Sequence, residues 1–286
     1  SLKEITLPNS LTTIEVMAFG ECYQLESFTA PDTLISFGDI SGNINDVRTF
    51  IDCTNLTTVT FGENSQLSII PASVFSGLEN LKTITLPPKL ESIEAGAFYD
   101  CSSLTSVDFH HSDDTVPPLT IKESAFGRCN KLTSLTLPKG TSDVSGAFIS
   151  ECNLLETIIF TDNDDPSNNG LTMVKESFVE LPELHTIRFP NHLKSLASGM
   201  IRDCDKTETI DLSGSNMLKT ISEFAFIDLK ELKNIYLPNS ITTIKQEAFA
   251  GCVSLKEITL PNSLTTIGPG AFGKCYQLES FTAPDT

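Results

Sequence analysis

The clearest pattern in the sequence is a set of apolar positions that recurs at intervals of 23 residues or slightly more. Within residues 255–277 these positions are Leu255, Ile258, Leu260, Leu264, Ile267, Ala271, Phe272 and Cys275. The opening Leu-x-x-Ile-x-Leu alternates in part and contains β-branched residues, which is typical of a short strand. Pro261 then ends that strand, because proline has no N–H to donate to a ladder. The rest of the unit returns through a tight turn, so we expect each unit to form one coil of a stacked chain.

The leading leucine of this unit recurs through the whole chain. It is found at Leu2, Leu25, Leu56, Leu81, Leu104, Leu132, Leu155, Leu184, Leu232, Leu255 and Leu278, with Thr207 in the slot between Leu184 and Leu232. One unit cannot bury its apolar side alone, whereas stacked copies can, and a period of this length indicates a solenoid. We therefore predict one elongated domain over residues 1–286, with about 11–12 coils of basic period 23.

One slot of the repeat holds an aromatic ring in almost every coil. The rings are Phe19, Phe50, Phe75, Phe98, Phe126, Phe148, Phe178, Phe226, Phe249 and Phe272, and Ile201 is the one exception. We therefore predict a continuous aromatic spine, in which truncation of one ring costs about 3–5 kcal/mol.

A second slot holds the eight cysteines. They are Cys22, Cys53, Cys101, Cys129, Cys152, Cys204, Cys252 and Cys275, with Cys152 displaced by one. Leucine takes this slot in other coils, for example at Leu78 and Leu181, so the position is apolar and we expect free buried thiols. Disulfides between adjacent coils are the alternative, because stacked coils lie about 5 Å apart and that is within bridging range. Zinc is less favoured, since there is no Cys-x-x-Cys pair.

The motif Leu-x-x-Ile-x-Leu-Pro-x-x-Leu-x-x-Ile-x-x-x-Ala-Phe-x-x-Cys resembles the BspA-like class of leucine-rich repeats. It departs from the commoner leucine-rich pattern, which has Asn or Cys after the strand. The resemblance implies a right-handed, curved leucine-rich repeat solenoid, with a parallel β-sheet on the concave face and short strands or turns on the convex side. It also implies a secreted or surface protein of a microbe that binds host matrix proteins or other cells.

The charge of the chain narrows the classes of partner. The 286 residues include 19 basic and 37 acidic side chains, for a net charge of −18. This negative charge argues against nucleic acid and against anionic membrane surfaces as binding partners. It suits a secreted or surface protein that stays apart from its neighbours, with an acidic face for a basic partner as the alternative.

The sequence shows no signal peptide and no membrane-spanning run. It starts at Ser1 and stops at Thr286, each inside a repeat, and residues 1–33 nearly repeat residues 254–286. We therefore expect a fragment of a longer array, with any signal or anchor outside this segment and an extracellular or cell-surface location. We expect a monomer without membrane insertion in this segment.

The third and fifth residues of each strand are expected to point outward from the sheet. Most are Thr or Ser, which suit an exposed β surface without further meaning. Five fifth-position residues break that ladder: Asp108, Ile159, Arg188, Asp211 and Tyr236. All but Asp108 come from nearby coils. Arg and Tyr are also enriched at the hot spots of protein interfaces. We predict a ligand-binding patch of these five, with a simple surface ion pair of Arg188 as the alternative.

Two loops carry possible metal ligands, and neither has a strong motif. One contains His110, His111, Asp113 and Asp114, without fixed spacing on a rigid element. The other, residues 162–165, offers oxygen ligands for calcium but lacks the Gly and the closing Glu of a hand loop. We predict no metal site and no cofactor.

No motif in the chain indicates catalysis. No Gly-rich phosphate loop follows a strand, and the Gly-x-Ser-x-Gly elbow is absent. We therefore predict no catalytic residue and no enzyme. The first functional hypothesis is a protein-binding adhesion module whose partner is a host matrix or cell-surface protein. The alternatives are glycan recognition in a nutrient-capture system, which the scarce concave aromatics disfavour, and a structural spacer that displays another domain.

Overall fold

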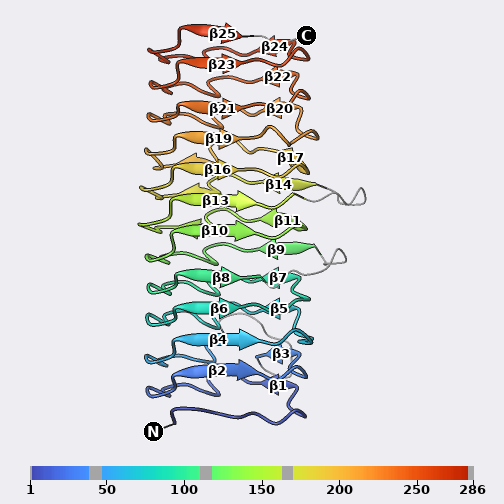
Figure 1. Cartoon of the computed structure of the whole chain (residues 1–286), viewed down its shortest axis with the longest axis vertical. Coiled ribbons are helices and arrows are strands. Elements are labelled where there is room, and N and C mark those ends of the chain that lie inside the picture. Colours follow the sequence, from blue (N-terminus) through green and yellow to red (C-terminus); the bar gives the residue numbers. More distant parts are fainter. Residues whose placement is uncertain (1, 39–46, 110–117, 163–169, 283–286) are drawn as a thin grey trace.

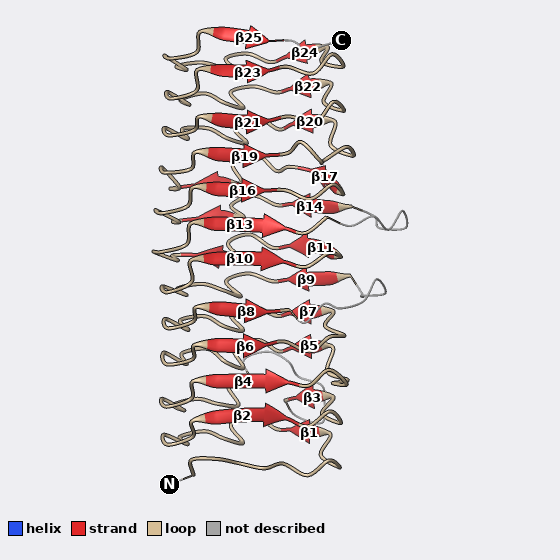
Figure 2. Ribbon diagram, viewed as in Figure 1, coloured by secondary structure: helices blue, strands red, loops and turns tan. Residues whose placement is uncertain are grey.

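The computed structural model describes residues 2–38, 47–109, 118–162 and 170–282. In these ranges the chain forms short strands joined by turns and loops, without a helix (Figure 2). The coils stack one on another along the long axis of the molecule, so that each strand lies beside its counterpart in the next coil (Figure 1).

The main sheet takes one strand from each coil after the first. Its strands are β2 (Ser27–Ala30), β4 (Thr58–Phe61), β6 (Thr83–Thr85), β8 (Ser106–Asp108), β10 (Ser134–Leu137), β13 (Thr157–Phe160), β16 (Thr186–Arg188), β19 (Thr209–Asp211), β21 (Asn234–Tyr236), β23 (Glu257–Thr259) and β25 (Ser280–Thr282). They pair in parallel in the runs β2-β4-β6-β8, β10-β13-β16-β19-β21 and β23-β25. Burial alternates along these strands except β25, as in β4, where Val59 and Phe61 are buried.

Shorter strands on the return path of each coil form a second set of parallel ladders. They are β1 (Thr13–Ile14), β3 (Ser36–Phe37), β5 (Ile69–Ile70), β7 (Ser92–Ile93), β9 (Leu119–Ile121), β11 (Thr141–Val144), β14 (Leu171–Met173), β17 (Leu193–Ser195), β20 (Thr220–Ile221), β22 (Thr243–Ile244) and β24 (Thr266–Ile267). The middle coils add a third ladder of β12 (Ile149–Ser150), β15 (Phe178–Val179) and β18 (Ile201–Arg202). The inward side chains of these strands meet in one continuous core, apart from β24 and β25, which are exposed at the C-terminal end. The fold is the parallel solenoid predicted from the sequence.

The aromatic slot departs from the prediction in one coil. The third ladder pairs Ile149 with Phe178, and Phe178 with Ile201. Phe148 is the residue before, and its carbonyl accepts the N–H of Phe126, as alanine carbonyls do in other coils. Ile149 therefore holds the slot that we assigned to Phe148.

The predicted continuous aromatic spine was therefore wrong for the middle coils. The rings form two parallel stacks with 5.3–5.5 Å between neighbouring centroids. One stack contains Phe19, Phe50, Phe75, Phe98 and Phe126, and the other contains Phe226, Phe249 and Phe272. Isoleucine fills the slot in two of the coils between them.

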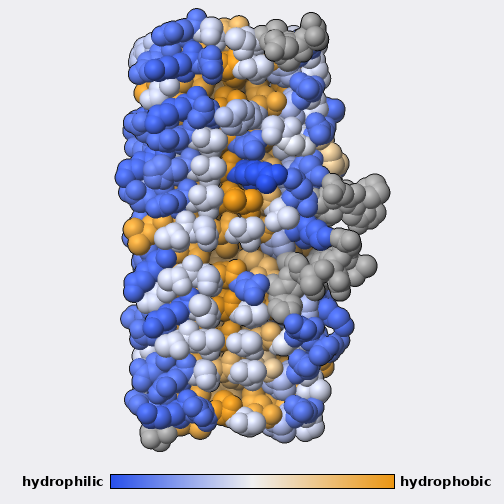
Figure 3. All heavy atoms as spheres, viewed as in Figure 1, coloured by the Kyte–Doolittle hydropathy of each residue, from blue (hydrophilic) through white to orange (hydrophobic). Residues whose placement is uncertain are grey.

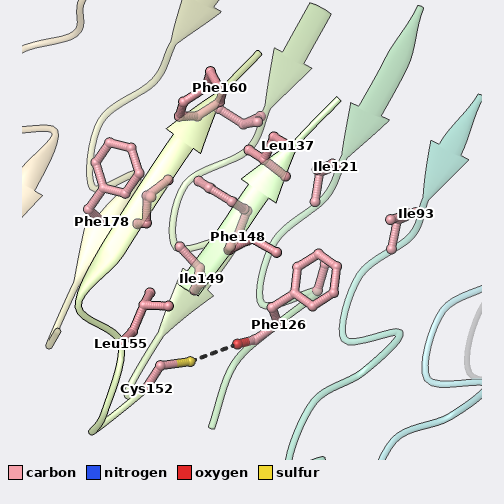
Figure 4. Close-up of a cluster of buried hydrophobic side chains, with 14 of the residues drawn as sticks. Ile93, Ile121, Phe126, Leu137, Phe148, Ile149, Cys152, Leu155, Phe160 and Phe178 are labelled. Carbon is pink, nitrogen blue, oxygen red and sulfur yellow. Dashed lines mark hydrogen bonds between the residues drawn. The ribbon is translucent and has the colours of Figure 1, made fainter. Parts of the chain in front are cut away.

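All eight cysteines are free thiols, as predicted, and six of them are buried. Sγ of Cys152 donates to the carbonyl oxygen of Phe126 at 3.1 Å (Figure 4). Cys101 makes the same bond to Phe75, also at 3.1 Å. Cys152 thus occupies its slot in register, and the one-residue displacement that we predicted for it belongs to Phe148 instead. The slot combines a buried sulfur with a weak bond to the preceding coil.

The turn around the aromatic slot depends on two residues with left-handed backbone. In the coil of Phe178 these are Glu176 and Glu180, each with φ of 55°. The second of the two positions recurs at Gly77 and Gly251, where glycine adopts this conformation without a steric penalty. Because most coils use other residues here, the turn edge carries a row of side chains, many of them acidic.

Candidate functional site

Four of the five predicted site residues lie side by side on the main sheet. The register pairs Ile159 of β13 with Arg188 of β16, Arg188 with Asp211 of β19, and Asp211 with Tyr236 of β21. Each follows a buried residue of its strand and points away from the core. In Figure 3 near-white side chains follow the main sheet, and strongly hydrophilic ones interrupt them at the level of β16 and β19. We name Ile159, Arg188, Asp211 and Tyr236 the main-sheet patch.

Asp108 lies apart from the main-sheet patch. It ends β8, and its neighbour in register is Thr85 of β6. Strand β10 lies between β8 and β13 and carries Thr136 at the corresponding position (Figure 1). The predicted group of five is therefore a contiguous row of four and a separate fifth residue.

Asp162, which we did not predict as part of the patch, holds Arg188 in place. Nη2 of Arg188 lies 2.6 Å from Oδ2 of Asp162, and Oδ1 accepts the N–H of Asn191 at 2.9 Å. The ion pair that we named as the alternative thus exists, with a partner from the preceding coil. The signal in the sequence is the position of Asp162 just after a main-sheet strand, in a coil that lacks the usual strand-ending proline.

The other three residues of the row keep groups available for a partner. Oδ1 of Asp211 accepts the N–H and the hydroxyl of Ser213 at 2.9 and 2.7 Å, while Oδ2 has no protein partner within the described ranges. Tyr236 is 51% exposed, and no described residue bonds its hydroxyl. Ile159 is half-buried at the other end. The patch presents an apolar, a cationic, an anionic and an aromatic side chain in that order.

Polar side chains surround the main-sheet patch. Nζ of Lys233 lies 2.8 Å from Glu208, and this hydrogen bond lowers the pKa of Glu208 and raises the pKa of Lys233. Nδ2 of Asn234 donates to the hydroxyl of Thr209 at 3.4 Å. A polar rim around a few large side chains is the usual composition of a protein-binding surface.

A buried histidine braces the chain beside Asp162. His192 is buried, and its Nε2–H donates to the carbonyl of Thr141, two coils earlier, at 3.1 Å. The carbonyl of His192 accepts the N–H of Leu171 at 2.9 Å. Burial lowers the pKa of His192, and the nearby Asp162 carboxylate opposes that shift. Arg188 is therefore joined through Asp162 and Asn191 to a well-packed part of the core.

A hollow with a volume of about 530 Å³ lies on the turn edge and crosses several coils. Nε of Arg128 bonds Glu151 at 2.9 Å, and its guanidinium lies 5.5 Å from the ring centroid of Tyr99. The amides of Asn130 and Asn153 bond each other at 2.9 Å. We name this hollow the turn-edge groove; Asp100, Arg128, Asn130, Glu151, Asn153 and Glu180 contribute to its wall.

The two loops with possible metal ligands lie largely outside the described residues. Those positions are His110, His111, Asp113, Asp114, Asn163, Asp164 and Asp165. Among the residues that the structure describes, no group of three or more His, Cys, Asp or Glu side chains is placed to hold a metal ion. The same ranges contain no helix with the length and apolar character needed to cross a membrane.

Comparison with known protein families finds one family model, of a repeat, that matches the chain. The family model described as "BspA type Leucine rich repeat region" matches the chain in 6 copies, over residues 1–115, 43–166, 116–215 and 171–286. A search of curated proteins finds no match.

Several solved structures are similar to this chain. A leucine-rich cell surface protein from Faecalibacterium prausnitzii is 24% identical, with 100% of this chain and 88% of that chain covered and a TM-score of 0.41. A leucine-rich repeat protein from Bacteroides ovatus is 22% identical, with 96% and 88% covered and a TM-score of 0.43. The pneumococcal vaccine antigen PcpA is 19% identical, with 99% and 84% covered and a TM-score of 0.38.

Proposed function

Because this chain belongs to the BspA-type leucine-rich repeat family, we propose that it is a non-enzymatic, protein-binding adhesion module at a microbial cell surface. Leucine-rich repeat proteins of this kind are generally protein-interaction or surface proteins. We propose a host matrix or cell-surface protein as the partner, and an extracellular location for the domain.

The main-sheet patch is the observation that carries this proposal. Elsewhere the outward positions of the main sheet are mostly small hydroxyl residues, whereas four adjacent strands here carry Ile159, Arg188, Asp211 and Tyr236. Arg and Tyr carry a large share of the binding energy in protein interfaces. The surface is therefore chemically distinct at one place, on a rigid stack that holds it in fixed geometry.

The test is a binding panel of matrix proteins and host cells with two patch variants. Arg188→Ala and Tyr236→Ala are each expected to weaken binding about tenfold or more, as hot-spot truncations do. Thr29→Ala and Thr60→Ala change the same face in early coils and serve as matched controls. Unchanged affinity in both patch variants would remove the patch from the proposal.

The turn-edge groove favours a second candidate, glycan binding. Its wall combines amides, carboxylates and a guanidinium, groups that can bond sugar hydroxyls, and Asn130 and Asn153 each retain amide atoms without a described protein partner. A glycan array tests this candidate. Binding to a neutral glycan that Asn153→Ala abolishes, and that Arg188→Ala leaves intact, would favour the groove over the main-sheet patch.

A further inference from the structure

The spacing of the main-sheet patch limits the shape of a partner that can contact all four residues. The four are in direct register on the adjacent parallel strands β13, β16, β19 and β21. Neighbouring strands lie about 4.8 Å apart, so the row from Ile159 to Tyr236 covers about 14 Å along the stack. A partner must therefore present four side chains in line over that length.

An α-helix that lies along the stack meets this requirement. Residues i, i+3, i+7 and i+10 of a helix share one face and span about 15 Å at a rise of 1.5 Å per residue. An extended strand places side chains on one face about 6.6 Å apart, so it offers three over the same length. The four-residue row thus fits a helix better than a strand.

The charges of the row define the facing residues of that helix. Arg188 has five N–H donors, and Asp162 engages one nitrogen, so the half-exposed guanidinium can bind a further carboxylate. Oδ2 of Asp211 can accept a bond from a cation, because Ser213 bonds only Oδ1. An acidic residue therefore fits opposite Arg188 and a basic residue opposite Asp211.

The two ends of the row fit apolar residues. Ile159 is half-buried and Tyr236 is 51% exposed, and both expose apolar surface that a partner would cover. Beyond them the corresponding positions are Thr136 in β10 and Thr259 in β23, which return to the hydroxyl ladder. The chemically distinct row therefore ends at Ile159 and Tyr236.

We infer that the main-sheet patch binds an amphipathic α-helix of a protein partner, which lies along the stack with an apolar, an acidic, a basic and an apolar residue facing the sheet. The inference rests on the proposed function, since it specifies the partner at the same site. The helix of the partner can run in either direction along the stack, because the row fixes only the order in which the facing charges occur.

The test uses synthetic peptides and fluorescence anisotropy. The probe is a labelled, alanine-rich peptide of about 20 residues, long enough to be partly helical, with Leu, Glu, Lys and Leu at i, i+3, i+7 and i+10. Two matched peptides carry Glu/Glu or Lys/Lys at the central positions, with a compensating charge on the far face that keeps the net charge equal. A fourth peptide carries proline on the far face, which breaks the helix.

We expect saturable binding of the Glu/Lys probe, at least tenfold tighter than either like-charge peptide and lost with proline. Arg188→Ala and Tyr236→Ala should each weaken it at least tenfold, while Thr60→Ala does not; circular dichroism checks that each variant is folded. Absence of binding up to about 1 mM overturns the inference, and so does equal binding of the proline peptide.

Failure of this inference is distinguishable from failure of the proposed function. A protein partner that depends on Arg188 and Tyr236 but does not compete with the probe leaves the protein-binding patch in place and overturns the helix. A panel in which no partner responds to the patch variants overturns both.

Discussion

At the scale of single residues, the buried thiols link stability to pH on the alkaline side. Burial raises the pKa of Cys53 to about 12, whereas an exposed thiol titrates near pH 8.5. Above pH 8.5 the unfolded chain loses this proton first, so the folded state binds more protons and the free energy of unfolding falls as pH rises.

We predict that Cys53→Ala makes this alkaline decline shallower. Urea unfolding of the wild type and the variant between pH 7 and pH 11 measures it. Parallel declines in the two proteins would show that Cys53 does not titrate as its burial indicates.

His192 links stability to pH on the acid side. Its pKa is lowered by burial, so its contribution to stability is complete above the unfolded value near 6.5 and is lost as pH falls through the lowered folded value. His192→Gln retains a donor for the carbonyl of Thr141 but cannot titrate. We predict that the difference in free energy of unfolding between wild type and His192→Gln shrinks between pH 7.5 and pH 5; a constant difference would contradict this.

The outward direction of the patch residues could be predicted from alternation along the strands, because a strand has a period of two. The bond between Arg188 and Asp162 could not be predicted from the sequence. Those residues are 26 positions apart, and their contact depends on the path of the chain after β13. Sequence spacing alone does not supply that path, since coil lengths in this chain vary.

At the scale of the element, the ring slot shows why a motif can mislead. Ala147-Phe148 matches the Ala-Phe pair of other coils, so the repeat pattern predicts Phe148 in the slot. The structure instead keeps the thiol slot three residues after the ring slot, from Ile149 to Cys152, as from Phe126 to Cys129. The turn between the two slots fixes this spacing, and it outweighs the identity of the side chain.

The ring stacks predict unequal effects of truncation. Phe98 is fully buried between Phe75 and Phe126, with centroids 5.5 and 5.3 Å away. Phe98→Ala should lower the free energy of unfolding by about 3–5 kcal/mol, because it leaves a cavity in a stack. Phe281→Ala, at a ring that is 53% exposed, is the control and should cost about 1 kcal/mol. Chemical denaturation of both variants measures this, and equal losses would contradict the stacked arrangement.

At the scale of the whole molecule, the excess of acidic residues affects stability. With 37 acidic and 19 basic side chains, like charges dominate over the exposed ion pairs such as Lys206–Glu183. Salt screens this repulsion within a Debye length of about 10 Å at 0.1 M. We predict that raising NaCl from 10 to about 500 mM raises Tm by at least about 2 °C. Calorimetry tests it, and a lower Tm at high salt would show that attractive pairs dominate.

The stack as a whole could be predicted from the 23-residue period, because every coil repeats the same inward set. The positions of its long loops could not be predicted, and the two loops with possible metal ligands fall largely outside the described residues. A repeat pattern specifies what each coil shares with its neighbours, whereas an insertion has no counterpart in the next coil to fix its position.

The break between the two ring stacks lies in the coils that carry the main-sheet patch. Ile201 belongs to the same coil as Arg188, and Ile149 to the coil just before Ile159. The interior that supports the main-sheet patch thus lacks the continuous stack of slot rings found at both ends. Its rings make other contacts, Phe148 with Phe178 and Phe160 with Phe189, with centroids 5.8 and 5.9 Å apart. A partner bound to the patch would cover the outer face of these coils, so we expect it to slow deuterium uptake there.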